Sequence, residues 1–242
     1  MPGRIDLPRR VGRALDSLET AYGKPRLERV YPPLDELILT ILSQNTNDRN
    51  RDRAYEALRR RFPTWEEAMV ADREALEETI RVGGLARTKS GVIQSVLHGV
   101  LREEGVLSLD RLKSVPVQEA RRYLAGFKGV GEKTICCVLL FACGHPAFPV
   151  DTHIHRVTKR LGWVPATATP AATHARMASL VPPGRYLTAH INLITLGRRV
   201  CRARAPSCPV CPVRRACRYA LRRRGGFRRP VAQGRRLRRP GA

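Results

Sequence analysis

Residues 117–143, VQEARRYLAGFKGVGEKTICCVLLFAC, indicate the fold of this chain most directly. Two helical patterns, at about 117–126 and 133–143, are separated by a short segment that contains Gly129 and Gly131. Glycine allows positive φ and a close approach of the backbone, so this segment predicts a tight hairpin between two helices. Amides at the start of the second helix would then point outward, where they could hold a phosphate. The pattern alone leaves both a plain turn and a phosphate site open.

Helical periodicity continues on both sides of the hairpin. In PPLDELILTIL, residues 32–42, leucine and isoleucine recur at i, i+3, i+4, i+7 and i+8, as expected for one face of a helix. Further helices are predicted at about 49–61, 65–71, 73–80, 87–103, 152–162, 170–181 and 185–197. The sequence shows no alternating strand pattern and no repeat of fixed period. We therefore predict an all-α fold.

The excess positive charge is concentrated in the C-terminal part of the sequence. The chain has 45 Lys and Arg against 21 Asp and Glu, a formal net charge of +24. All 21 acidic residues lie within 1–151, whereas residues 152–242 contain 21 basic residues and no acidic one. A GC-rich genome would explain arginine in place of lysine, but it would not explain the missing carboxylates. A field of this kind favours a polyanionic partner, most simply nucleic acid.

The two ends of the sequence bear on where in the cell the protein is expected. Residues 222–242, RRRGGFRRPVAQGRRLRRPGA, hold nine Arg and four Gly, which predicts a disordered basic tail that adds affinity for phosphates. The start, MPGRIDLPRR, lacks the hydrophobic stretch of a secretory signal. No apolar run reaches the length of a membrane span. We expect a cytoplasmic, nucleoid-associated protein with no membrane partner.

Four cysteines near the C-terminus have the spacing C-x6-C-x2-C-x5-C, namely Cys201, Cys208, Cys211 and Cys217. Thiolates this close on a short loop can converge on one metal centre, and disulfides are the weaker alternative because nothing else suggests secretion. A four-cysteine zinc site usually has two C-x2-C pairs, and only one is present. An iron–sulfur cluster also takes four cysteines. The spacing favours iron–sulfur and leaves zinc open. Three other cysteines are expected to be core residues, Cys136, Cys137 and Cys143.

Lys133 and Asp151 are the candidate catalytic residues. Lys133 follows the hairpin and is one of six lysines in a chain with 39 arginines. An amine can lose its proton and act as a nucleophile, whereas a guanidinium cannot do so in a protein. By composition alone, Lys133 could equally be a surface residue at a helix start. Asp151 precedes a helical pattern, so it can cap that helix, serve in acid–base chemistry, or do both.

Beyond these residues, five motifs resemble those of endonuclease III, within the helix-hairpin-helix DNA glycosylase superfamily. They are ILSQNTND at 41–48, GGLARTKS at 83–90, KGVGEKT at 128–134, VDTHIHRV at 150–157 and the cysteine loop at 201–217. The resemblance covers about residues 25–220, with the motifs in the family's order and approximate spacing. No single motif is specific, but the combination is.

The resemblance implies two helical lobes with a DNA groove between them. One lobe would be a six-helix barrel containing the helix-hairpin-helix, at 25–145. The other would join 1–24 to 146–221 and hold a [4Fe–4S] cluster on Cys201, Cys208, Cys211 and Cys217; residues 222–242 would form the basic tail. In this family the cluster shapes a basic loop that meets DNA phosphates and takes no part in base removal. We expect a monomer that binds double-stranded DNA with damaged bases or abasic sites.

The resemblance also implies a reaction and the residues that contact DNA. Lys133 would attack C1′ of a flipped-out nucleotide, and Asp151 would deprotonate the amine or stabilise charge on the sugar. The resulting Schiff base permits β-elimination, so the enzyme would be a base excision repair glycosylase for oxidised pyrimidines and an abasic-site lyase. Leu85 would wedge into the base stack and Gln44 or Asn45 would fill the gap. The residues implied to contact DNA are Gln44, Asn45, Asp48, Leu85, Lys89, Gly129 and Gly131.

Two alternatives remain open at this point. The first is a mismatch- or purine-directed glycosylase of the same fold, which would have a different pocket. The second is a non-catalytic DNA-binding module with a structural metal. The pairing of Lys133 with Asp151 argues against the second alternative.

Overall fold

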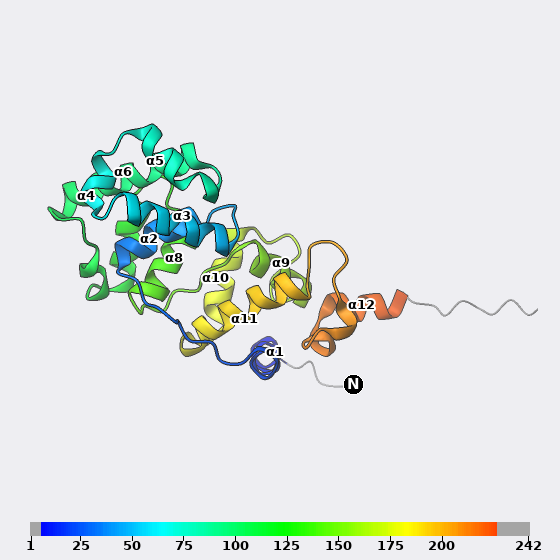
Figure 1. The fold of residues 1–242 in the computed structure, drawn as a ribbon. Helices are drawn as coiled ribbons and strands as arrows, with labels where there is room; N and C mark the ends of the chain where they lie inside the picture. Colours follow the sequence, from blue (N-terminus) through cyan, green and yellow to red (C-terminus); the bar gives the residue numbers. More distant parts are fainter. Residues whose placement is uncertain (1–5, 227–242) are drawn as a thin grey trace, which may run out of the picture.

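The computed structural model describes residues 6–226, and within this range every regular element is a helix (Figure 1). The α-helices are α1 (Leu7–Tyr22), α2 (Pro33–Leu42), α3 (Asp48–Arg61), α4 (Trp65–Val70), α5 (Arg73–Ile80), α6 (Ala86–Glu104), α7 (Val117–Ala125), α8 (Glu132–Cys137), α9 (Thr152–Leu161), α10 (Pro170–Leu180), α11 (Tyr186–Arg199) and α12 (Arg218–Gly226). The all-α prediction is thus confirmed for the part of the chain that is described.

Helix α2 lies at the centre of the first hydrophobic core. It begins at Pro33, whose fixed φ and missing N–H suit the first turn of a helix. Its aliphatic residues are buried on nearly every side, because α3, α6, α8 and the π-helical turn Val138–Ala142 all pack against it. The buried residues of this core extend from Leu34 to Ala147.

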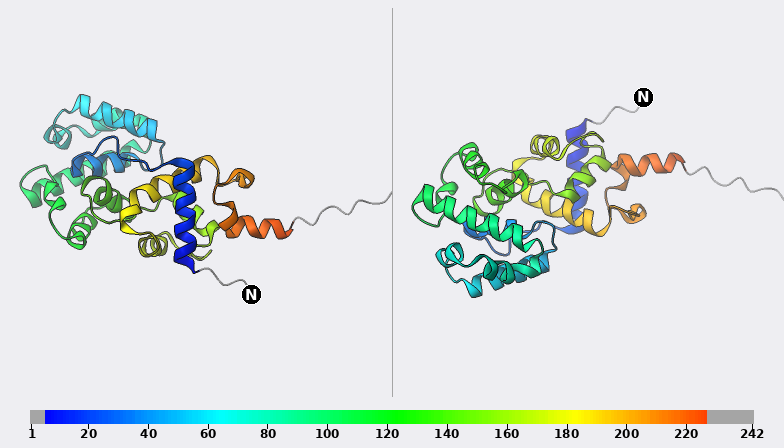
Figure 2. Two further views of the ribbon diagram at one scale, coloured as in Figure 1. Left: turned by 90° about the horizontal axis from the view of Figure 1, so that it is seen from below. Right: turned by 90° about the horizontal axis from the view of Figure 1, so that it is seen from above.

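A second hydrophobic core is built from two separate stretches of the chain. Buried residues of α1, from Val11 to Leu18, pack with buried residues between Phe148 and Ala220. Helix α11 is central here and contacts both α9 and α1. Figure 2 shows α1 lying across this half of the molecule, far from its neighbours in sequence. The chain therefore leaves the second core after α1 and returns to it after Ala147.

Most predicted helices are present, with differences at the ends. The pattern at 133–143 is not one regular α-helix, because α8 ends at Cys137 and continues as a π-helical turn, Val138–Ala142. Helices α1 and α12 were not predicted. Helix α12 runs to Gly226, so the first five residues of the predicted disordered tail have helical backbone. The helix is anchored because Ala220 is buried in the second core. The rest of the predicted tail, 227–242, lies outside the described residues.

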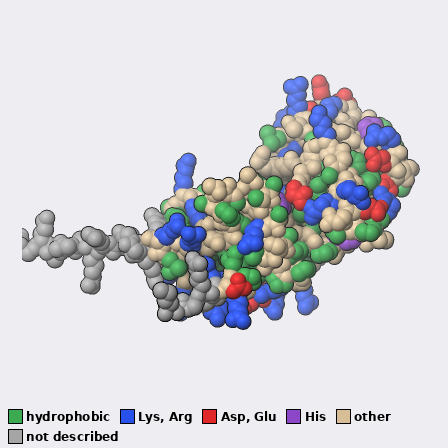
Figure 3. All heavy atoms as spheres, turned by 180° about the vertical axis from the view of Figure 1, so that it is seen from behind, with side chains coloured by type: hydrophobic (Ala, Val, Ile, Leu, Met, Phe, Trp, Pro, Cys, Tyr) green, Lys and Arg blue, Asp and Glu red, His purple; other side chains and the backbone are tan. Residues whose placement is uncertain are grey.

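The distribution of charge on the folded surface follows the sequence. Over the face in Figure 3, acidic side chains lie mainly on the half formed by α2–α8, while basic side chains extend over both halves. No helix in the range 6–226 combines the length and the apolar character that crossing a bilayer requires.

Candidate active site

The glycine hairpin joins α7 to α8, as predicted, but its two glycines do different things. Gly129 has φ +88°, and a Cβ at this position would lie 2.7 Å from Cγ2 of Val92 on α6. Both the backbone conformation and the close approach therefore require glycine there. Gly131 is the N-cap of α8 and has φ −90°, and a Cβ added to it would meet no other atom within 4 Å. Gly131 thus does not use the positive φ that glycine allows, and it leaves the entrance to α8 open.

Lys133 lies in the first turn of α8, half-buried, and faces the end of α2. Its Nζ donates a hydrogen bond to Oγ of Ser43 at 3.3 Å. Lys133 lines a cavity of about 900 Å³, and the same cavity is lined by Asp151. The remaining walls include residues of both hydrophobic halves, such as Gln44 from one and His190 from the other. The two predicted catalytic residues thus share one cavity at the junction of the two cores.

Asp151 is held in place by the helix that follows it. Its Oδ1 accepts a hydrogen bond from the backbone N–H of Ile154 at 2.7 Å, so Asp151 is the N-cap of α9. The predicted capping role is confirmed. Because the side chain also lines the cavity, it can face a ligand while its capping oxygen fixes its orientation.

The loop between α2 and α3 brings three further predicted residues to this cavity, namely Gln44, Asn45 and Asp48. Asn45 is exposed and has φ 52°, an uncommon left-handed conformation for a residue other than glycine. Asp48 does not cap α3, because Asn47 does so by accepting from the N–H of Asn50. Asp48 instead pairs with Arg198 of α11, and the hydrogen bond from Arg198 lowers the pKa of the Asp48 carboxyl.

Leu85 stands out on the surface before α6. Its side chain is 54% exposed and its φ is 50°, so a large apolar residue is both uncovered and held in the left-handed region. Such backbone strain is concentrated at functional positions in proteins. Among the predicted DNA contacts that do not line the cavity, Leu85 is the one that places a large apolar side chain in solvent.

Lys89 was predicted to contact DNA, and its burial contradicts this. Only 1% of the residue is exposed, and its Nζ donates to the carbonyl oxygens of Leu42 and Gly83, each at 2.8 Å. Burial lowers the pKa of the Lys89 ammonium. Lys89 therefore holds the turn before Leu85 against the end of α2 and does not reach a ligand on the surface.

Two residues of the cavity were missed by the sequence analysis. Glu36 of α2 is only 7% exposed and accepts a hydrogen bond from Oγ1 of Thr40 at 3.0 Å; burial raises the pKa of its carboxyl to about 7. His190 of α11 is 4% exposed, its Nδ1 lies 2.9 Å from the carbonyl oxygen of Pro149, and burial lowers its pKa to about 4. An acidic residue inside the apolar pattern of 34–42 was the available signal for Glu36.

The four C-terminal cysteines are gathered in one loop after α11, and Cys217 is buried in the second core. Burial, with the charges of the other three thiols, raises the pKa of the Cys211 thiol to about 11. Tetrahedral zinc at ~2.3 Å from sulfur would need sulfurs about 3.8 Å apart. Within residues 6–226, no three of these sulfurs lie within 4.8 Å of one another. The charges of Cys201, Cys208 and Cys217 nevertheless act on the Cys211 thiol, so the four side chains lie near one another and could hold one metal centre.

A different group of possible metal ligands lies between α8 and α10, formed by Glu132 and Cys136 of α8 and His174 of α10. The Arg121 guanidinium pairs with Glu132 and lies 3.7 Å from the sulfur of Cys136. A cationic side chain thus already occupies this position. Cys136 and Cys137 are buried as predicted, and Cys143 packs partly buried against the first core.

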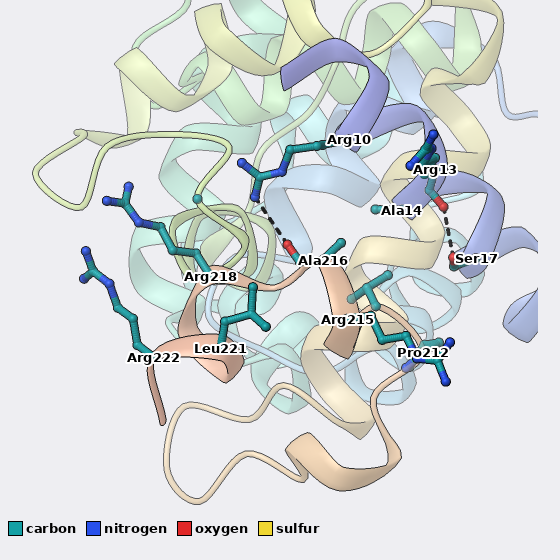
Figure 4. Close-up of a pocket in the computed structure, with 12 residues that line it drawn as sticks. Arg10, Arg13, Ala14, Ser17, Pro212, Arg215, Ala216, Arg218, Leu221 and Arg222 are labelled. Atoms are coloured by element: carbon teal, nitrogen blue, oxygen red, sulfur yellow. Dashed lines mark hydrogen bonds between the residues drawn. The ribbon is translucent and has the colours of Figure 1, made fainter. Parts of the chain in front are cut away.

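Basic side chains also surround a second cavity, of about 1170 Å³, between α1, the cysteine loop and α12 (Figure 4). The arginines that line it are Arg10, Arg13, Arg215, Arg218 and Arg222. Figure 4 shows Arg218 and Arg222 extending from α12 in the same direction. No carboxylate is among the described residues of its wall, which agrees with the charge asymmetry of the sequence.

Comparison with known proteins gives consistent matches. Residues 38–183, more than half of the chain, match the HhH-GPD superfamily of base excision DNA repair proteins. Endonuclease III of Thermotoga maritima is 33% identical over 201 residues, which cover 83% of this chain and 89% of that protein. A putative DNA glycosylase of Arabidopsis thaliana is 39% identical over 165 residues, 68% of this chain.

Some of these relatives are much longer than this chain. The match spans 56% of the putative Arabidopsis glycosylase and 12% of the Arabidopsis DNA glycosylase/AP lyase ROS1, which is 31% identical over 172 residues. Among solved structures, a trapped endonuclease III–DNA covalent intermediate superimposes with a TM-score of 0.78 at 28% identity. That superposition covers 90% of this chain and 98% of the other.

Proposed function

Because the chain belongs to the endonuclease III family of the HhH-GPD superfamily of base excision DNA repair proteins, we propose that it is a bifunctional DNA glycosylase and abasic-site lyase. Its substrates are double-stranded DNA with oxidised pyrimidines or abasic sites, and it acts as a monomer at the nucleoid. The observation that carries this proposal is the presence of Lys133 and Asp151 in one cavity where the two hydrophobic halves meet.

In the proposed reaction the damaged nucleotide turns out of the duplex into this cavity. The Lys133 nitrogen forms a bond to C1′ as the bond from C1′ to the base breaks, and the base leaves with a proton. Asp151, whose orientation is fixed by capping α9, faces the positive charge that develops on the sugar. Opening of the sugar ring gives a Schiff base. Loss of a C2′ proton then expels the 3′ phosphate, and water releases the enzyme.

The proposed DNA contacts lie around the cavity. Leu85, exposed on a strained turn, enters the base stack, and Gln44 and Asn45 occupy the space left by the flipped nucleotide. The hairpin at Gly129 and Gly131 meets the phosphates near the lesion. Asp48 orients Arg198 towards the same cavity through their ion pair.

We further propose that Cys201, Cys208, Cys211 and Cys217 hold a [4Fe–4S] cluster, which is supported by the gathering of the four free thiols in one loop and by the similarity to endonuclease III. When bound, the cluster supplies structural cross-linking of the loop. The protein also holds this loop by hydrogen bonds. The Arg160 guanidinium donates to the carbonyl oxygens of Arg202 and Ala203, at 2.6 and 2.8 Å. The domain arrangement proposed is a lobe at 25–145 and a lobe of 1–24 with 146–221, supported by the two separate cores.

The test is reductive trapping with borohydride on duplex DNA that holds one abasic site. A covalent protein–DNA adduct is expected for the native chain, and none is expected for Lys133→Gln. A panel of duplexes, each with one damaged base, then scores base release and strand cleavage separately. An adduct of unchanged yield with Lys133→Gln would refute the proposed nucleophile.

A further inference from the structure

A line of polar side chains runs along one face of helix α2, which is aliphatic over most of its length. Glu36, Thr40 and Ser43 are four and three residues apart, so they lie on one face of the helix. All three line the cavity that contains Lys133. The rest of this helix after its first turn is aliphatic and buried, with Leu37, Ile38, Leu39, Ile41 and Leu42. Polar groups at this depth are retained only where hydrogen bonds or function compensate for the loss of water.

These side chains form hydrogen bonds from Lys133 towards Glu36. Nζ of Lys133 donates to Oγ of Ser43 at 3.3 Å, and Ser43 Oγ donates to the carbonyl oxygen of Thr40 at 2.7 Å. The side-chain hydroxyl of Thr40, which is not the group that accepts from Ser43, donates to Oε1 of Glu36 at 3.0 Å. The hydroxyls therefore fix Lys133 at one end of the line and the Glu36 carboxyl at the other.

The groups that face Glu36 come from three helices. Burial has the largest influence on its pKa and opposes ionisation, while Thr40 of its own helix, Lys133 of α8 and Arg51 of α3 favour the ionised form. Cys137, one turn after Lys133, is buried near both Lys133 and Glu36, and burial raises the pKa of its thiol to about 11. Lys133 is thus the group near Glu36 from which the proposed reaction requires a proton to be removed.

We propose that Glu36 accepts the proton that the Lys133 ammonium must lose before its nitrogen can react with the sugar. This inference rests on the function proposed above. One N–H bond of Lys133 breaks and an O–H bond forms on Glu36. The freed lone pair bonds to the aldehyde carbon C1′ of an abasic site. The carbonyl oxygen takes up two protons, the one held by Glu36 and a second one from the nitrogen, and leaves as water. Glu36 does not contact the sugar itself. It is a positioning residue, because it affects the reaction only by setting the protonation state of the Lys133 amine.

A carboxyl that titrates near pH 7 suits this task. Proton transfer is most effective when the acceptor titrates near the working pH. Burial raises the pKa of Glu36 into this range, and the carboxylate becomes available as the pH rises through about 7. Asp151, by contrast, already uses Oδ1 to cap α9. The two carboxylates then have different roles: Glu36 accepts the proton of the Lys133 amine, and Asp151 faces the sugar.

The experiment measures the single-turnover rate of adduct formation with cyanoborohydride on abasic duplex DNA between pH 5 and 9. For the native chain the rate should rise with pH and level off near pH 7. Glu36→Gln should be slower at pH 7 by about 100-fold, and its rate should keep rising about tenfold per pH unit without levelling. Glu36→Asp should recover part of the rate and the levelling.

Asp35→Asn is the matched control, because Asp35 is the adjacent carboxylate of α2. It accepts hydrogen bonds from Tyr55 and Trp65 and is outside the cavity wall. Its pH profile should match that of the native chain. If Glu36→Gln keeps the native profile while the native chain forms the adduct and Lys133→Gln does not, the role of Glu36 is refuted and the proposed function stands. If the native chain forms no adduct, both proposals are overturned.

Discussion

Replacing Glu36 by glutamine should change how the stability of the fold depends on pH. The carboxyl has a pKa of about 7 in the folded chain against an ordinary value of 4.5, because burial disfavours the charged form. Between these two pH values the folded chain binds more protons than the unfolded chain. The free energy of unfolding is therefore unaffected by Glu36 below pH 4.5, and it decreases as the pH rises towards and through 7. Glutamine is neutral and similar in shape, so the variant lacks this loss.

The size of the effect follows from the difference between the two pKa values. Each pKa unit is worth about 1.4 kcal/mol, so raising the pKa from 4.5 to about 7 costs roughly 3 kcal/mol once Glu36 is ionised in both states. Urea unfolding at pH 5, 6, 7 and 8 measures this directly for the native chain and Glu36→Gln. The difference between them should move by up to about 3 kcal/mol in favour of the variant as the pH rises. Curves that stay parallel from pH 5 to 8 would show that Glu36 ionises as freely as in the unfolded chain.

Three further predictions concern other parts of the site. Gly129→Ala should lower the free energy of unfolding by about 2 kcal/mol, because φ is +88° and the new methyl group meets Val92, whereas Gly131→Ala should have little effect; thermal unfolding of the pair measures the contrast. Lys89→Met should cost about 2 kcal/mol in urea unfolding, since the carbonyl oxygens of Leu42 and Gly83 lose their donor, and the salt dependence of DNA affinity should not change because Lys89 does not reach phosphates. Leu85→Gly should raise the free energy of unfolding by about 1 kcal/mol by relieving the left-handed strain and should slow base release from duplex DNA, whereas equal base release by the two proteins would contradict the proposed wedge.

The helices could be predicted from the sequence better than the burial of single polar residues. That Lys133 and Asp151 would share a cavity was expected only from the resemblance to a known family. Periodicity and the hairpin glycines are local signals, so α2, α7 and the start of α8 could be read from them. Lys89 was misjudged because its carbonyl partners belong to Leu42 and Gly83, and only the packing of α6 against α2 brings them together. Glu36 was missed for the same reason, since Lys133 approaches it from a helix almost a hundred residues later.

Helix α1 was overlooked although its sequence carries a helical pattern, with Val11, Ala14, Leu15 and Leu18 at i, i+3, i+4 and i+7. Helix α12 is short of apolar residues when considered alone, and it is completed by the second core, where Ala220 is buried. The charged sequence of 222–226 suggested no structure, but the preceding turn of α12 is anchored and the helix continues.

The division of the second core between the two ends of the chain also has a consequence for biosynthesis. During translation α1 leaves the ribosome before α11, against which it packs and which is made more than 160 residues later. The residues from 34 to 147 can meanwhile form their own core from contacts within that stretch. The first core can therefore form while α1 has no partner, and the cavity with both Lys133 and Asp151 is complete only after α11 has been made.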